Sequence, residues 1–214
     1  MKTRKLISLQ DVEAAASQKA KTLVVPEGAI VTDAARDLAR NRQIELVAGP
    51  EFVDGASSSV RTIAVGSDHG GFDFKSQLIP FINDLGWKVS DVGTDSSSSC
   101  DYPDFAFAVA HLVSTGKVRF GLMIDGAGVG SAMVCNKVNG VRAACAYNEF
   151  VAWNARAHND ANVLTLGSRT MGIEVCKSMI KTFLSTEFEG GRHAKRTSKI
   201  DDVELNSAKR ASGG

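Results

Sequence analysis

The sequence predicts an α/β fold, a Rossmann-like doubly wound five-stranded parallel sheet with a small N-terminal α/β extension. After residue 60, short apolar segments alternate with amphipathic helical segments, which is the pattern of parallel strands joined by crossover helices. The apolar segments are nearly continuous, as expected for strands that are covered on both faces. With 214 residues, the chain is long enough for one sizeable core and a small additional module.

In chain order, the strands are expected at residues 62–67, 87–92, 120–124, 141–146 and 163–166. The helices are expected near residues 72–85, 103–115, 129–137, 148–157 and 172–184. Ligands of such sheets bind beyond the carboxyl ends of the strands, at the topological switch point. The polar residues that follow the strands are therefore the candidate site residues.

Residues 54–60 have the small, polar composition of a linker. They separate an N-terminal extension, residues 1–53, from a main domain at residues 61–200, and residues 201–214 are expected to form a tail. In the extension, helices are expected at residues 9–19 and 31–41 and strands at 22–25 and 44–47, with Thr32 and Asp33 as candidate N-cap residues.

The composition argues against several classes of protein. A formal net charge of +1 lacks the basic excess of a nucleic-acid-binding surface. No apolar run is long enough to span a bilayer, and the N-terminus lacks an apolar signal-peptide core, so a cytoplasmic protein is expected. The four cysteines form no C-x-x-C pair. They are expected to be reduced, with Cys135 and Cys145 as small core residues.

Residues 123–131, MIDGAGVGS, end an apolar strand with a carboxylate and a glycine-rich turn. The glycines allow backbone N–H groups to approach a polarised oxygen closely, and the next segment would place a helix N-terminus there. Two simpler interpretations stay open. The glycines can serve only tight strand-to-helix packing, and Asp125 can cap the following helix.

Other polar residues follow the remaining strands. Asp68 and His69 lie in SDHGG, a pair that is also typical of capping near a turn. The DYPD motif at residues 101–104 is typical of a helix start with proline in its first turn. Arg192 and Arg196 would share a helix face if their segment is helical, and paired arginines can hold a phosphate.

In this order, the motifs SDHGG, DYPD, GAGVG, HNDANVLTLGSR and EGGRHAKR resemble the ribose-5-phosphate isomerase B and galactose-6-phosphate isomerase family, over roughly residues 61–200. The resemblance implies a Rossmann-like fold, a homodimer or homotetramer, and a sugar-phosphate site built from two subunits. It also implies aldose–ketose isomerisation, of the ribose-5-phosphate/ribulose-5-phosphate type, through an enediol intermediate. No metal and no cofactor are implied.

The resemblance also assigns roles to residues. Asp125, His158 and Asp68 would be catalytic, with His158 assisting ring opening. The sugar would be contacted by His69, Tyr102, Gly126, Gly128, Gly130 and Asn159. The phosphate would be held by Arg169, Arg192, His193 and Arg196.

The sequence departs from the family at the base. One branch has a cysteine at the position of Asp125 with a threonine at that of Ala127, and the other branch has a glutamate at that of Ser131. This chain resembles the cysteine-lacking A-type subunit of galactose-6-phosphate isomerase, which works with a cysteine-bearing partner. One hypothesis is therefore an isomerase with Asp125 as substituted base, made more basic by a dry site. The alternative is a non-catalytic or partner-dependent sugar-phosphate-binding subunit with a cysteine-bearing paralogue.

The N-terminal extension lies outside this pattern. Residues 24–37, VVPEGAIVTDAARD, are similar to a short segment of bacterial microcompartment enzymes. Residues 1–53 are therefore hypothesised to dock to a microcompartment shell or cargo, and the alternative is an ordinary accessory arm.

Overall fold

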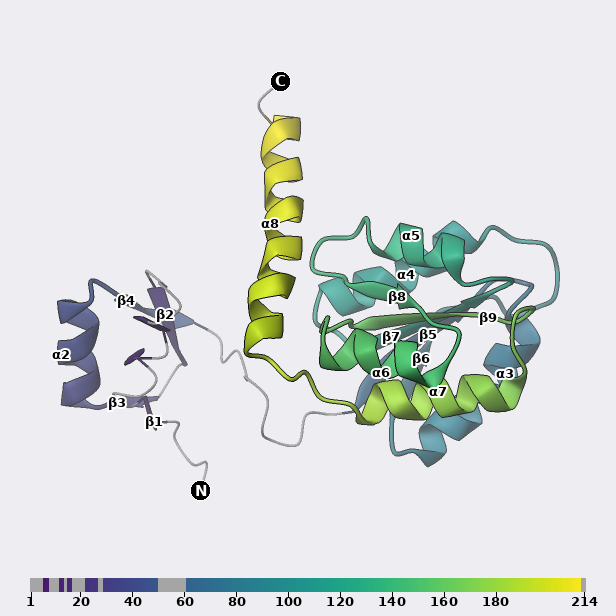
Figure 1. Ribbon diagram of the computed structural model, residues 1–214, viewed down its shortest axis with the longest axis horizontal. Helices are drawn as coiled ribbons and strands as arrows, with labels where there is room; N and C mark the ends of the chain where they lie inside the picture. The colour runs from purple at the N-terminus through teal and green to yellow at the C-terminus, as the bar shows by residue number, and fades with distance from the viewer. Residues whose placement is uncertain are drawn as a thin grey trace. The chain divides into compact units, whose positions relative to one another are not determined.

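The computed structural model describes residues 6–7, 12–13, 15–16, 22–26, 29–49 and 61–212, and the chain divides into two compact units, residues 1–59 and 60–214 (Figure 1). The strands of the larger unit are β5 (Thr62–Ser67), β6 (Lys88–Asp91), β7 (Phe120–Asp125), β8 (Ala143–Cys145) and β9 (Val163–Gly167). Its helices are α3 (Phe72–Asp84), α4 (Tyr102–Ser114), α5 (Val129–Cys135), α6 (Glu149–Ala157), α7 (Ile173–Ser185) and α8 (Arg192–Ser212).

The five strands form one parallel sheet in the order β6-β5-β7-β9-β8, so the predicted fold class is confirmed. Figure 1 shows α4 and α5 on one face of the sheet and α3, α6 and α7 on the other. Each face has its own buried apolar cluster, and burial of that area is the main favourable term for the fold. The strand order reverses direction between β5 and β7, which makes their carboxyl ends the topological switch point.

Two strand glycines set the distance between the sheet and α4. A Cβ built on Gly66 of β5 would lie 2.7 Å from Val109, and one built on Gly121 of β7 would lie 2.6 Å from the same side chain. Neither contact is sterically allowed, so only glycine lets α4 approach this closely. Because α4 begins at Tyr102, this packing fixes where Tyr102 stands relative to the end of β7.

The smaller unit is built from short parallel pairs and one described helix. Strand β1 (Leu6–Ile7) pairs with β3 (Ile30–Val31), and β2 (Thr22–Pro26) pairs with β4 (Glu45–Gly49). Thr32 Oγ1 accepts a hydrogen bond from the Ala35 N–H at 3.2 Å and caps α2 (Asp33–Asn41), as predicted. Of the helix expected at residues 9–19, residues 12–13 and 15–16 are helical, and the others lie outside the described residues.

Two expectations about the larger unit are corrected. Residues 201–212 are not a separate tail, because they continue α8. Cys145 is half-buried rather than a core residue, whereas Cys135 is fully buried as expected. Among the described residues, no helix combines the length and the apolar character needed to cross a membrane.

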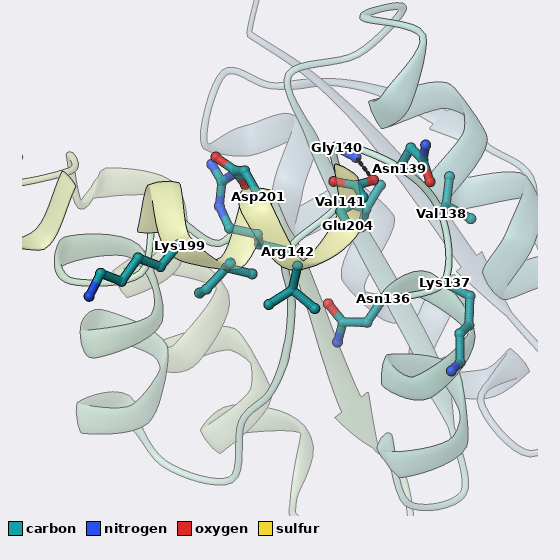
Figure 2. Close-up of a pocket in the computed structure, with 12 residues that line it drawn as sticks. Asn136, Lys137, Val138, Asn139, Gly140, Val141, Arg142, Lys199, Asp201 and Glu204 are labelled. Atoms are coloured by element: carbon teal, nitrogen blue, oxygen red, sulfur yellow. Dashed lines mark hydrogen bonds and ion pairs between the residues drawn. The ribbon is translucent and has the colours of Figure 1, made fainter. Parts of the chain in front are cut away.

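The middle of α8 is tied to the loop that precedes β8. Arg142 forms ion pairs with Asp201 at 3.1 Å and with Asp160 at 2.7 Å, and Glu204 accepts a hydrogen bond from the Gly140 N–H at 2.8 Å. Figure 2 shows the groove between these segments, lined by residues 136–142 of the loop and residues 199–201, 203 and 204 of α8. These contacts orient the helix that carries Arg192 and Arg196.

Candidate functional site

The loops that follow β5, β7 and β9 meet at the carboxyl edge of the sheet. Ser168, after β9, donates from Oγ to the Gly70 carbonyl at 2.6 Å and from its N–H to the Asp125 carbonyl at 2.8 Å. Tyr102 joins them, since a Cβ on Gly130 would lie 2.6 Å from its ring. We call Asp68, His69, Tyr102, Asp125 and Arg169, with the turn of residues 126–130, the carboxyl-edge cluster.

Asp68 and His69 are held by backbone groups. The Asp68 carboxylate is buried and accepts hydrogen bonds from the N–H groups of Gly70 at 2.9 Å and Gly71 at 3.1 Å. The His69 Nδ1 atom lies 3.1 Å from the carbonyl oxygen and 3.2 Å from the nitrogen of Cys100. The capping arrangement is therefore present at Asp68, while the His69 ring is held through its Nδ1 atom.

The Asp125 carboxylate is buried and accepts four hydrogen bonds. One oxygen accepts from the N–H groups of Ala127 and Gly128, and the other accepts from the N–H and hydroxyl of Ser131. Asp125 thus caps the N-terminal turn of α5, as the simpler interpretation of the motif predicts. The backbone N–H groups of Ala127 and Gly128 in the turn and of Ser131 in α5 are used in this way, so they are not available to a substrate oxygen in this arrangement.

A second group of residues gathers where α6 ends and α8 begins. We call His158, Asn159, Glu189, Arg192, His193 and Arg196 the amino-edge cluster. The His158 and His193 rings stack with their centroids 4.0 Å apart and their planes 7° apart, and the Glu189 N–H donates to the Ala157 carbonyl at 3.0 Å. Because α8 is helical from Arg192, the predicted shared face of Arg192 and Arg196 is confirmed.

The charges of the amino-edge cluster are closely coupled. Glu189 Oε2 lies 3.4 Å from His158 Nε2 and 3.7 Å from His193 Nε2, and Arg192 Nε donates to His193 Nε2 at 3.2 Å. Burial, followed by the neighbouring positive charges of His158 and Arg192, lowers the pKa of His193. The cluster therefore presents arginine charge beside an imidazole that is held neutral.

Within one chain, the two clusters lie at opposite edges of the sheet. Asp125 pairs with Gly167, the last residue of β9, whereas His158 and Asn159 precede the first residue, Val163. Each strand residue advances about 3.3 Å, so the length of β9 separates the two clusters. The sequence-predicted residues are thus brought together in two separate clusters rather than in one.

Comparison with known proteins identifies the family of this chain. The family model described as Ribose/Galactose Isomerase matches residues 63–200, which is most of the larger unit. The chain belongs to the ribose/galactose isomerase family. The match begins after the smaller unit, so the family accounts for the sheet and both clusters but not for residues 1–59.

Individual members of the family align over nearly their whole length. Ribose-5-phosphate isomerase B of Escherichia coli is 40% identical over 145 residues, covering 68% of this chain and 97% of the relative. D-erythrulose-4-phosphate isomerase of Pectobacterium atrosepticum is 38% identical over 140 residues, covering 65% and 92%. The solved structure of Clostridium thermocellum ribose-5-phosphate isomerase B superposes with a TM-score of 0.67 at 42% identity, covering 68% of this chain and 99% of that chain.

Sequence reasoning missed four residues that contact the two clusters or belong to them. Ser131 as a donor to Asp125 and Cys100 as the support of His69 depend on loop geometry, which residue types do not reveal. Asn154, whose Nδ2 atom lies 2.8 Å from His158 Nδ1, had a readable signal because it precedes His158 by four residues on a helix. Glu189 is the first residue of the motif EGGRHAKR, but its residue type alone does not predict a contact with the two histidines.

Proposed function

We propose that this chain interconverts an aldose phosphate and a ketose phosphate through an enediol intermediate, with Asp125 as the base. The observation that carries the proposal is a buried carboxylate at the switch point of the sheet, directly before the N-terminus of α5. Family membership supports the reaction class, since the relatives are isomerases named for the phosphates of four- and five-carbon sugars. A substrate of the ribose-5-phosphate type is the first to test.

In the proposed reaction, one proton moves between adjacent carbons and a second proton moves between the oxygens on those two carbons. His158 assists ring opening by transferring a proton between the ring oxygen and the hydroxyl of the first carbon. Asp125 removes the proton from the carbon next to the carbonyl, and the electron pair moves to the carbonyl oxygen to give the enediolate. The hydroxyl proton on the neighbouring carbon is transferred to this oxygen, and Asp125 then delivers its proton to the former carbonyl carbon, which leaves the new carbonyl on the neighbouring carbon. Free N–H groups of the glycine turn and the His69 ring would stabilise the oxygen that becomes negative.

The separation of the two clusters supports a site completed by a second copy of the chain. The carboxyl-edge cluster of one copy would supply Asp125, Asp68, His69 and Tyr102, and the amino-edge cluster of the other would supply His158 and the phosphate-binding arginines. Exposed apolar side chains surround the carboxyl edge: Val129 is 50%, Met133 63%, Tyr147 66% and Phe150 67% exposed. Large apolar side chains left this exposed favour an interface with another protein surface.

The four donors on Asp125 favour a second candidate, a sugar-phosphate-binding subunit that needs a cysteine-bearing partner. A carboxylate whose oxygens are all used by a helix cap has few lone pairs left to accept a proton. An assay of the purified chain with ribose-5-phosphate, ribulose-5-phosphate and a panel of phosphorylated hexoses separates the candidates. Turnover supports the first candidate, whereas binding seen by thermal shift without any turnover supports the second.

Thiol alkylation is expected to leave turnover unchanged, because the proposed base is a carboxylate. Burial raises the pKa of Cys135 to about 12 and raises the pKa of Cys145 and Cys176, so their reactive thiolate forms are scarce at neutral pH. The Cys100 sulfur lies 3.9 Å from His69 Nδ1. Wild type and Cys100→Ser are therefore assayed before and after iodoacetamide, and equal turnover is expected in all four samples. A loss on alkylation that occurs in the wild type but not in Cys100→Ser would contradict this expectation and place the Cys100 thiol at the reacting centre.

We also propose that residues 1–53 dock the enzyme to a microcompartment shell or cargo. The support is the short sequence similarity described above and the division of the chain into two units. Deletion of residues 1–53 is expected to abolish co-localisation with shell proteins while the turnover of the remaining domain is retained. Unchanged co-localisation of the deletion variant would refute the docking role.

A further inference from the structure

We propose that His158, Glu189 and His193 form a binding site for a divalent transition-metal ion of the zinc class. Each residue offers one ligand atom, and the three atoms lie within 4.8 Å of one another. Two imidazole nitrogens and one carboxylate oxygen are a common protein ligand set for zinc, with water at the fourth position. The site is built from the end of α6, the loop before α8 and the first turn of α8.

The separations of the ligand atoms fit one ion. Tetrahedral zinc with ligands at about 2.1 Å requires neighbouring ligand atoms to lie about 3.4 Å apart. Glu189 Oε2 lies 3.4 Å from His158 Nε2 and 3.7 Å from His193 Nε2. The stacked rings have to tilt to direct both lone pairs at one point, and rotation about χ2 of histidine is soft.

The surroundings of the His193 ring favour the metal-binding tautomer. His193 is 4% exposed, and its Nδ1 atom has no hydrogen-bond partner within the described part of the chain. Its Nε2 atom accepts from Arg192, which places the lone pair of the neutral ring on the side of Glu189. The Asn154 Nδ2 atom lies 2.8 Å from His158 Nδ1, so ligation through His158 Nε2 requires the Asn154 amide to turn its oxygen toward the Nδ1–H group, which is the outer contact that orients a ligating ring.

Arg192 competes with the ion for His193. The Arg192 Nε atom donates to the same Nε2 lone pair at 3.2 Å and adds a positive charge beside the site. Metal binding therefore requires Arg192 to move away, and an ion in place would withdraw His158, His193 and Arg192 from the sugar phosphate. A bound ion is therefore expected to inhibit turnover. This inhibition rests on the proposed function, whereas the metal affinity itself does not.

The test measures Zn²⁺ affinity of the full chain by competition with a chromophoric chelator, independently of any turnover. Glu189→Gln and His193→Asn are each expected to weaken Zn²⁺ binding by about tenfold or more, since each removes one of three ligands. The exposed His111 lies outside the cluster, so His111→Ala is the matched control and should bind as the wild type does. Equal affinity in wild type, Glu189→Gln and His193→Asn would overturn the proposal.

Two further readouts separate this site from thiol ligands and from the phosphate site. The Co²⁺-loaded chain is expected to show tetrahedral absorption without a thiolate-to-cobalt band, and a strong thiolate band that persists in Glu189→Gln would overturn the assignment. Arg192→Ala is expected to bind Zn²⁺ more tightly and inorganic phosphate more weakly. Weaker Zn²⁺ binding in Arg192→Ala would overturn the competition, whereas unchanged phosphate binding would overturn only the phosphate role in the proposed function.

Discussion

Replacement of Asp125 with asparagine is expected to lower kcat by about 10³-fold, the usual scale for loss of a general base. The amide cannot take up the substrate proton at neutral pH, although it has nearly the same size and reach as the carboxylate. Sugar-phosphate affinity should change little, because Arg192, His193 and Arg196 of the proposed phosphate-binding set lie in the other cluster and Arg169 is unchanged. Steady-state kinetics together with ligand-induced thermal shifts of the two proteins would measure both effects.

The same substitution has a structural cost that must be separated from the catalytic one. Both Asp125 oxygens accept from donors, and an amide nitrogen in place of one oxygen would face N–H or O–H groups. Leaving buried donors unpaired costs about 1–3 kcal/mol. Asp125→Asn should therefore also lower the Tm, and its rate must be measured well below that temperature.

Ser131→Ala is the matched control. It removes the hydroxyl donor to Asp125 but keeps the carboxylate, at a position that is fully buried in the wild type. We expect a loss of about 1 kcal/mol of stability and a kcat close to that of the wild type. If Asp125→Asn also keeps the wild-type kcat, the carboxylate is only a helix cap and the base lies elsewhere.

The fold was largely predictable because burial on both faces leaves a strong signal in the sequence. All five strands of the main sheet and the helices between them lie where the apolar runs place them. The ends of the helices were less predictable, because contacts of individual side chains determine where a helix stops. Helix α5 was expected to reach residue 137 but stops at Cys135. The side-chain amide of the next residue, Asn136, forms two hydrogen bonds with the backbone of Ala143 at the start of β8.

The candidate residues were predictable from their motifs, but their grouping depended on topology. The residues of HNDANVLTLGSR span β9, so His158 and Arg169 are close in sequence yet lie at opposite edges of the sheet. To predict this separation from the sequence, one would have to know that β9 runs parallel to β7 in the sheet. The contact of Glu189 with His158 and His193 depends on the loop through Gly190 and Gly191, which adopt φ values of 63° and 54° that favour glycine.

A mixture of two inactive variants is expected to regain activity if each site combines two copies of the chain. Asp125→Asn disables the carboxyl-edge cluster, and Arg192→Ala disables the amino-edge cluster. A mixed dimer has one site that carries both substitutions and one site that carries neither. With random pairing, half of the dimers are mixed and half of their sites are intact, so about a quarter of the wild-type activity should return.

The measurement is kcat/KM after co-expression of the two variants with different affinity tags and isolation of the doubly tagged species, which should reach about half of the wild-type value. Each variant alone, treated in the same way, is the control and should stay inactive. A doubly tagged species without activity would contradict the composite site, because a site contained within one chain is damaged in both variants. Regained activity requires that Asp125 of one copy and Arg192 of the other act on the same substrate, as their positions at opposite edges of the sheet predict.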